Sequence, residues 1–130
     1  MLLKTCAAAG VFVLLSAAGA KADCTSTNSP FDDVYCDIQV FHQADHQLND
    51  DYSALKKLLN PTQQAALKEG EVAWIKDRNA QCTQTDNDYE YVAMDCAVAM
   101  TNKRDDFIKA RERECSSTGC VDSELAKEND

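Results

Sequence analysis

The rarest side chains of this sequence recur at helical spacing in one stretch. Trp74, Arg78 and Cys82 are four residues apart, so on a helix they lie near one face. They form either an exposed site or an internal framework, in which a buried indole lies beside an arginine bonded to a carboxylate or to carbonyls at a helix end. Helical periodicity favours the framework. Thr101 and Arg104, on the next helical stretch, would belong to it.

His42 and His46 are also four apart, with Asp45 between them. One helix face that carries both imidazoles could hold a metal ion. However, the sequence shows no second cluster of ligands, and two ligands do not make a site. We therefore expect a solvated helix face with no metal and no other cofactor.

A short acidic segment with tyrosines lies between Cys82 and Cys96. It contains Asp86, Asp88, Tyr89, Glu90 and Tyr91. A disulfide-stapled loop of this composition could occupy the cleft of a cationic hydrolase, with carboxylates paired to basic residues and a tyrosine as anchor. An ordinary polar turn is the alternative. Because loops carry function more often than cores, this loop is the predicted partner-binding site.

The sequence contains no motif for catalysis. It has no phosphate-binding loop, no serine elbow and no HExxH. The cysteines are expected to be oxidised, so none would be a free nucleophile. Since no nucleophile–base pair can be named, the sequence predicts a binding protein and not an enzyme.

Three helices are predicted to position these residues. Ser29-Pro30 and Asn60-Pro61 each place a capping side chain before a proline at the first helical position. The expected helices cover residues 31–59, 61–82 and about 89–114, with a polar loop at 83–88 and no strand. The fold class is therefore all-α, a three-helix antiparallel bundle stapled by disulfides. Gly70 either permits close packing or marks a bend in the second helix.

Apolar spacing also predicts which side chains are buried. The first helix would bury Val34, Ile38, Phe41, Leu48, Tyr52, Leu55 and Leu59, and the third Tyr89, Val92, Cys96, Ala99, Met100, Phe107 and Ile108. The apolar side of the second helix includes Ala66, Leu67, Val72, Trp74 and Ile75.

The first 22 residues have the anatomy of a secretory signal peptide. A basic start precedes an apolar run that is too short for a membrane span, and Ala20-Lys21-Ala22 is a small-x-small cleavage signal. Cleavage after Ala22 would release a chain without a membrane anchor to the periplasm or medium. Loss of Lys4 and Lys21 takes the net charge from −9 to −11. That charge argues against nucleic acid and suits a cationic protein partner.

Cysteine usage predicts a disulfide framework. Six of the seven cysteines remain after cleavage, and an even number in an exported chain indicates disulfides. Six cysteines allow about 15 pairings, of which the simplest joins sequence neighbours: Cys24–Cys36, Cys82–Cys96 and Cys115–Cys120. The spacings match no zinc site. We expect one helical domain over residues 23–120 and a polar, frayed tail over 121–130.

The order and spacing of these features resemble the LprI-like lysozyme-inhibitor family of small exported bacterial proteins. The resemblance rests on Asp23-Cys24 with Cys36, Leu48-Asn49 before Tyr52, Ala73-Trp74-Ile75 with Arg78 and Cys82, and Cys96 with Thr101 and Arg104. Glu71 and Asp77 stand near places where the family often has a glutamine and an aromatic residue. The resemblance implies inhibition of a lysozyme-type muramidase by occlusion of its cleft. The alternatives are an immunity or envelope-stress protein with another partner, and a metal-handling protein that uses His42 and His46.

Overall fold

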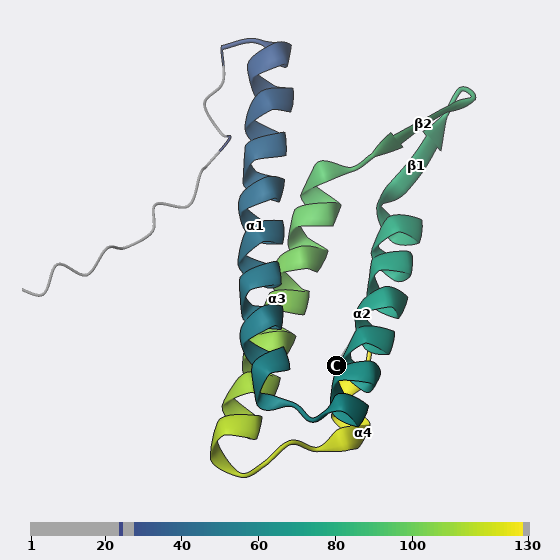
Figure 1. The fold of residues 1–130 in the computed structure, drawn as a ribbon. Coiled ribbons are helices and arrows are strands. Elements are labelled where there is room, and N and C mark those ends of the chain that lie inside the picture. The colour runs from purple at the N-terminus through teal and green to yellow at the C-terminus, as the bar shows by residue number, and fades with distance from the viewer. Residues whose placement is uncertain (1–23, 25–27, 129–130) are drawn as a thin grey trace, which may run out of the picture.

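The structure is a computed structural model that describes residues 24 and 28–128. The expected signal peptide lies outside these residues. The elements are α1 (Pro30–Leu58), α2 (Pro61–Cys82), β1 (Thr83–Asp86), β2 (Tyr89–Val92), α3 (Met94–Ser117) and α4 (Asp122–Leu125). Figure 1 shows α1, α2 and α3 running alternately along one long axis, as expected for an antiparallel bundle. No helix in the described part of the chain is long and apolar enough to cross a membrane.

The two predicted helix starts are confirmed. The Ser29 side chain accepts a hydrogen bond from the backbone N–H of Asp32 at the start of α1. At the start of α2, Asn60 and Gln63 form a reciprocal capping box, in which each side chain accepts from the backbone N–H of the other. These bonds satisfy amide groups that a helix leaves without partners in its first turn.

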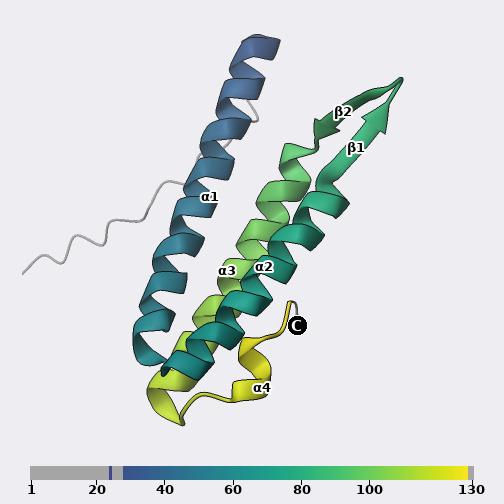
Figure 2. The same ribbon diagram turned by 45° about the vertical axis from the view of Figure 1, so that its right-hand side comes forward.

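The hydrophobic core occupies one half of the bundle, beside the α1–α2 turn and α4. Most packing runs through α3, which contacts α1 more extensively than it contacts α2 (Figure 2). The side chains at the centre of this half are Leu48, Leu55, Leu59, Leu67, Trp74, Phe107, Ile108 and Leu125. We call this half the closed end of the molecule.

The segment after α2 differs from the prediction. Residues 83–92 form a two-stranded antiparallel hairpin, and α3 begins at Met94 instead of near Tyr89. Asn87 and Asp88 have positive φ angles of 46° and 68°. Positive φ angles at both central residues are typical of the two-residue turn whose backbone twist matches that of the flanking strands in a hairpin. The prediction of a fold without strands was therefore wrong here, and Tyr89 and Val92 are exposed strand residues.

The first turns of α1 extend past the core. Val34 and Ile38 were predicted to be buried, but they are 59% and 50% exposed. Their spacing is that of an amphipathic helix, yet the described part of the chain leaves this face largely uncovered because the core lies at the closed end. Val72 and Ile75 on α2 and Ala99 on α3 are also exposed, contrary to the prediction from apolar spacing.

Residues 121–128 are docked on the bundle, so the expectation of a frayed tail is wrong for them. We call this segment the C-terminal strap. Leu125 in α4 is fully buried in the core. A Cβ atom at Gly70 would lie 3.0 Å from the backbone carbonyl carbon and oxygen of Ala126. Gly70 therefore permits close packing, the first of the two roles expected for it.

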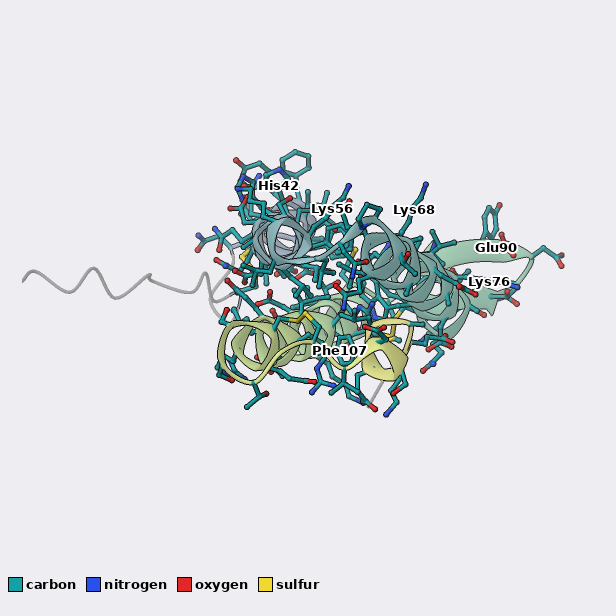
Figure 3. All side chains as sticks on the ribbon, turned by 60° about the horizontal axis from the view of Figure 1, so that its bottom comes forward. His42, Lys56, Lys68, Lys76, Glu90 and Phe107 are labelled. Carbon is teal, nitrogen blue, oxygen red and sulfur yellow. A yellow bond between two sulfur atoms is a disulfide. The ribbon has the colours of Figure 1, made fainter. Side chains whose placement is uncertain are left out.

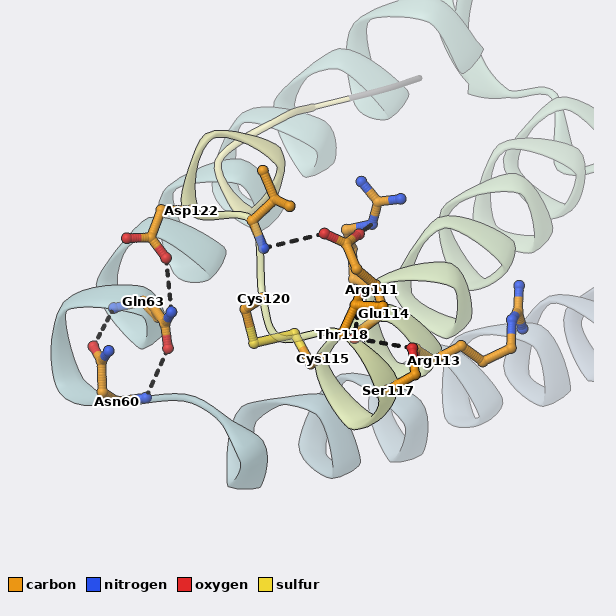
Figure 4. The surroundings of a disulfide bond; sticks show 11 residues. Asn60, Gln63, Arg111, Arg113, Glu114, Cys115, Ser117, Thr118, Cys120 and Asp122 are labelled. Atoms are coloured by element: carbon orange, nitrogen blue, oxygen red, sulfur yellow. Dashed lines mark hydrogen bonds and ion pairs between the residues drawn. A yellow bond between two sulfur atoms is a disulfide. The ribbon is translucent and has the colours of Figure 1, made fainter.

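A disulfide and a side-chain hydrogen bond lead the chain into the strap (Figure 4). Cys115 and Cys120 are bonded across the turn that follows α3. Beyond this turn, the Gln63 side-chain amide donates to the Asp122 carboxylate at 2.7 Å. The strap is thus connected to the start of α2 as well as to the end of α3.

Candidate partner-binding site

The acidic segment predicted to bind a partner forms the tip and second strand of the hairpin. In Figures 1 and 2 the hairpin continues beyond the end of α2 and projects from the body of the molecule. Every hairpin residue is exposed, and Tyr89 is 77% exposed. The Tyr91 hydroxyl donates to the Gln84 side-chain oxygen across the two strands at 2.7 Å. Tyr91 is therefore partly ordered within the hairpin, whereas Tyr89 lies at the tip beside the turn.

A disulfide fixes the base of the hairpin. Cys82 ends α2 and Cys96 lies in the first turn of α3, and their Cα atoms are 5.5 Å apart. The Ala93 N–H donates to the Cys82 carbonyl at 2.8 Å and closes the strand ladder at the same level. A hairpin of two short strands is marginal alone in water. The covalent base holds it on two helix ends and so orients the acidic tip.

Trp74 and Arg78 support this base from inside. Trp74 is buried, and the Arg78 guanidinium carbon lies 4.9 Å from the Trp74 ring centroid and 5.5 Å from that of Phe41. Arg78 also donates to the Asn79 side-chain oxygen and lies 4.0 Å from an Asp45 carboxylate oxygen. Aromatic faces attract a guanidinium, so Arg78 links α1 to α2.

Arg104 contacts both a carboxylate and backbone carbonyls, the two kinds of partner expected for a framework arginine. Its Nε donates to Glu71 at 3.0 Å, and its Nη1 donates to the backbone carbonyls of Lys127 and Glu128, each at 2.9 Å. Its guanidinium carbon lies 4.6 Å from the Phe107 ring centroid. Arg104 is buried and joins α3 to α2 and to the strap. Glu71, one of the departures from the family pattern, is its charge partner.

Thr101 is buried on α3 one helical turn before this arginine. Its hydroxyl donates to the Ala97 carbonyl at 2.7 Å, which satisfies its polar atom within the helix. Of the four residues that we assign as framework, Trp74, Thr101 and Arg104 are thus buried, whereas Arg78 is half-buried beside them.

A pocket of about 430 Å³ lies where α1 faces the base of the hairpin. Its lining comes from five elements, α1, α2, β1, β2 and α3, and comprises Phe41, Arg78, Asn79, Cys82, Thr83, Val92, Met94 and Ala97. Most of the lining is apolar. The sequence alone did not mark this pocket, because Phe41 was assigned to the core and Val92 to a helix.

A charged cluster fastens α1 to α3 away from the hairpin. Lys109 Nζ lies 2.5 Å from an Asp105 oxygen and 3.4 Å from an Asp51 oxygen. Burial raises the pKa of Asp105, although its hydrogen bond with Lys109 acts in the opposite direction. Burial also acts to raise the pKa of Asp51, but hydrogen bonds from Gln47, Asp105 and Lys109 outweigh it and hold that pKa below its ordinary value. The hydrogen bond to Asp105 raises the pKa of Lys109.

His42 and His46 lie on the outer face of α1, and His42 points away from the bundle (Figure 3). Their ring centroids are 6.4 Å apart, and His46 Nδ1 lies 3.1 Å from an Asp50 oxygen. Within the described residues, no three His, Cys, Asp or Glu side chains come together in a way that could hold a metal ion.

All three disulfides in the structure join cysteines that are neighbours in sequence. They are Cys24–Cys36, Cys82–Cys96 and Cys115–Cys120.

Comparison with known families identifies one match: the sequence model described as Lysozyme inhibitor LprI matches residues 22–106, which is most of the chain. No curated protein and no solved structure matches significantly.

Proposed function

The chain belongs to the LprI family of lysozyme inhibitors, and from this we propose that it binds a lysozyme-type muramidase and blocks its cleft without turnover. Family membership is the observation that carries the proposal. The projecting hairpin is its structural support, because a rigid, acidic, tyrosine-bearing segment suits the cleft of a cationic enzyme. The partner-binding residues are Asp86, Asp88, Tyr89, Glu90 and Tyr91.

Each part of the hairpin has a distinct task in this proposal. The carboxylates of Asp86, Asp88 and Glu90 steer the approach of a cationic enzyme and pair with its basic side chains. Tyr89 is the anchor, since an exposed aromatic ring buries much area at low entropic cost. The disulfide base limits the ordering that binding requires, which favours affinity.

Inhibition of a muramidase places the protein outside the cytoplasm. The disulfides and the family agree with export, and the family match begins at residue 22, next to the expected mature start at Asp23. We therefore propose that residues 1–22 are a signal peptide removed after Ala22, and that the mature chain acts in the periplasm or medium.

A titration tests the proposed function. Purified mature protein is added to lysozymes of several structural types during lysis of cell-wall suspensions. We expect activity of at least one enzyme to fall linearly to an endpoint near one inhibitor per enzyme. Absence of protection at micromolar excess against every enzyme tested would refute the proposal.

Two matched triple variants test the assigned residues. Asp86→Asn, Asp88→Asn and Glu90→Gln neutralise the hairpin, whereas Glu69→Gln, Asp106→Asn and Asp122→Asn remove the same charge from exposed positions outside it. We expect only the hairpin variant to weaken inhibition by about tenfold or more, because each interfacial charge pair contributes on the order of 1 kcal/mol. Equal weakening by both variants would show that overall charge, and not the hairpin, determines binding.

A further inference from the structure

Two segments of the molecule diverge from the closed end and form what we call the fork. One arm is residues 30–45 of α1 and the other is the hairpin, residues 83–92. The base is residues 94–102, the first turns of α3. Figure 1 shows the arms separating above the start of α3. The pocket of about 430 Å³ lies at this base.

An apolar stripe runs up the α1 arm from the pocket. Phe41 lines the pocket, and Ile38, Val34 and Phe31 precede it at steps of three, four and three residues. This spacing places all four on one helix face, so the stripe continues the direction in which Phe41 points. Phe31 is 80% exposed. Exposed apolar side chains that share one helix face are the kind of surface through which proteins bind partners.

The second arm offers apolar surface at the same base. Val92 lines the pocket from the hairpin and is half exposed, and Met94 continues the lining at the start of α3. The pocket volume falls within the range of about 300–1,000 Å³ that holds small ligands, and it is large enough for one aliphatic or aromatic side chain of a partner. A partner segment could therefore contact both arms and insert one anchor.

The charge of the fork determines the chemistry of that segment. Residues 30–45 and 83–102 contain eight acidic residues and no lysine or arginine. They are Asp32, Asp33, Asp37, Asp45, Asp86, Asp88, Glu90 and Asp95. Arg78 enters the pocket lining from α2, but its guanidinium lies over two aromatic rings and 4.0 Å from Asp45. A second copy of this chain would bring like charges together, whereas a basic segment would be attracted.

We infer that the fork is the docking site for a basic segment of a protein partner, with an apolar side chain of that segment in the pocket between the arms. The inference rests on the proposed function and deepens it. The partner contacts the α1 arm and the pocket as well as the hairpin tip, so the hairpin alone is only part of the site.

A pair of double variants tests the α1 arm. Val34→Ser with Ile38→Ser removes apolar surface from the stripe. Leu58→Ser with Val121→Ser removes similar surface from the closed end, where both residues are 48% exposed. Circular dichroism checks that both variants are folded. Binding is measured by calorimetry with two probes, an inhibited lysozyme and a short synthetic peptide of lysine and leucine.

We expect the stripe variant to bind each probe about tenfold to a hundredfold more weakly, because two aliphatic contacts are lost, and the closed-end variant to bind as the parent does. Amide chemical shifts of labelled protein should change on peptide addition within residues 30–45 and 83–102. Light scattering of the free protein checks for self-association.

The possible results separate this inference from the proposed function. Peptide binding at the fork without binding of any lysozyme would refute the proposed function and support the docking site. Lysozyme inhibition that the stripe variant retains in full would support the function and overturn the inference. Shifts confined to other surfaces, no peptide binding at millimolar concentration, or a dimer formed through the stripe would also overturn it.

Discussion

Substitution of Gly70 by alanine should destabilise the protein, contrary to the usual effect of this change in a helix. Alanine in a helix interior is favoured over glycine by about 1 kcal/mol. At this position, however, the new methyl group would lie 3.0 Å from the backbone of Ala126 and from the Lys127 carbonyl oxygen. Backbone atoms cannot rotate away as a flexible side chain can, so the C-terminal strap must shift.

The contacts of the strap set the upper bound of the cost. Complete release would expose Leu125, which contributes about 2 kcal/mol, and would break the two hydrogen bonds from Arg104, each worth about 1.5–3 kcal/mol. A displacement of a few tenths of an ångström loses only part of this. After the gain in helix propensity is subtracted from this cost, we expect the free energy of unfolding to fall by about 1–2 kcal/mol.

A double-mutant cycle makes the test specific. Gly70→Ala is introduced into the mature chain and into a chain shortened by deletion of residues 122–130, and all four proteins are unfolded in urea with their disulfides intact. In the shortened chain the atoms that the methyl group would meet are gone, so alanine should stabilise by about 1 kcal/mol. The reasoning would be refuted if Gly70→Ala raised the free energy of unfolding of the complete mature chain, or changed it with the same sign in both chains.

Three further predictions concern the charged cluster and the hairpin. Burial raises the pKa of Asp105, so the folded state holds this proton at pH values above 3.8, where the unfolded chain has released it. The contribution of Asp105 to stability therefore grows as the pH falls through that window. In urea titrations, the free energy of unfolding of the parent minus that of Asp105→Asn should increase as the pH is lowered. A difference that does not change with pH would contradict the assignment. Replacement of Cys82 and Cys96 by serine should lower the free energy of unfolding by about 3 kcal/mol on the chain-entropy estimate. The backbone amides of residues 83–93 should also exchange hydrogen faster. Unchanged exchange would show that the disulfide does not hold the hairpin. Asp88→Gly should stabilise the protein by about 0.5–1 kcal/mol, because glycine adopts the residue's φ of 68° without steric cost. Asp86→Gly removes the same charge outside the positive-φ turn and should not stabilise. Thermal denaturation of both variants therefore separates the effect of the turn from the loss of a charge.

Local signals in the sequence were sufficient to predict the first two helices. Ser29-Pro30 and Asn60-Pro61 specify helix starts through bonds between near neighbours, and the structure has both. The hairpin was missed because its turn is Asn87-Asp88 and lacks the glycine that most often marks such turns. Alternation of Thr, Gln and Tyr over strands of only four residues is also a weak strand signal.

The remaining differences arise from contacts between distant parts of the chain. Periodicity showed that Val34 and Ile38 share a face, but it could not show that the described fold leaves this face uncovered. Nor could it show that Leu125, in a mostly polar run, would reach the core while the following residues, Ala126 and Lys127, lie against Gly70. The acidic segment was identified by composition, whereas the pocket required the positions of five separate elements.

The cysteine pairing also bears on how the chain matures. Each bond joins one of the described cysteines to the next described one along the sequence, at separations of 12, 14 and 5 residues. If the chain is oxidised in the order in which it crosses a membrane, every bond can form as soon as its second thiol arrives. No earlier partner has to be exchanged for a later one, so the correct set requires an oxidant but no disulfide isomerase. Successive closure of short loops also reduces the conformations left to search before the helices dock.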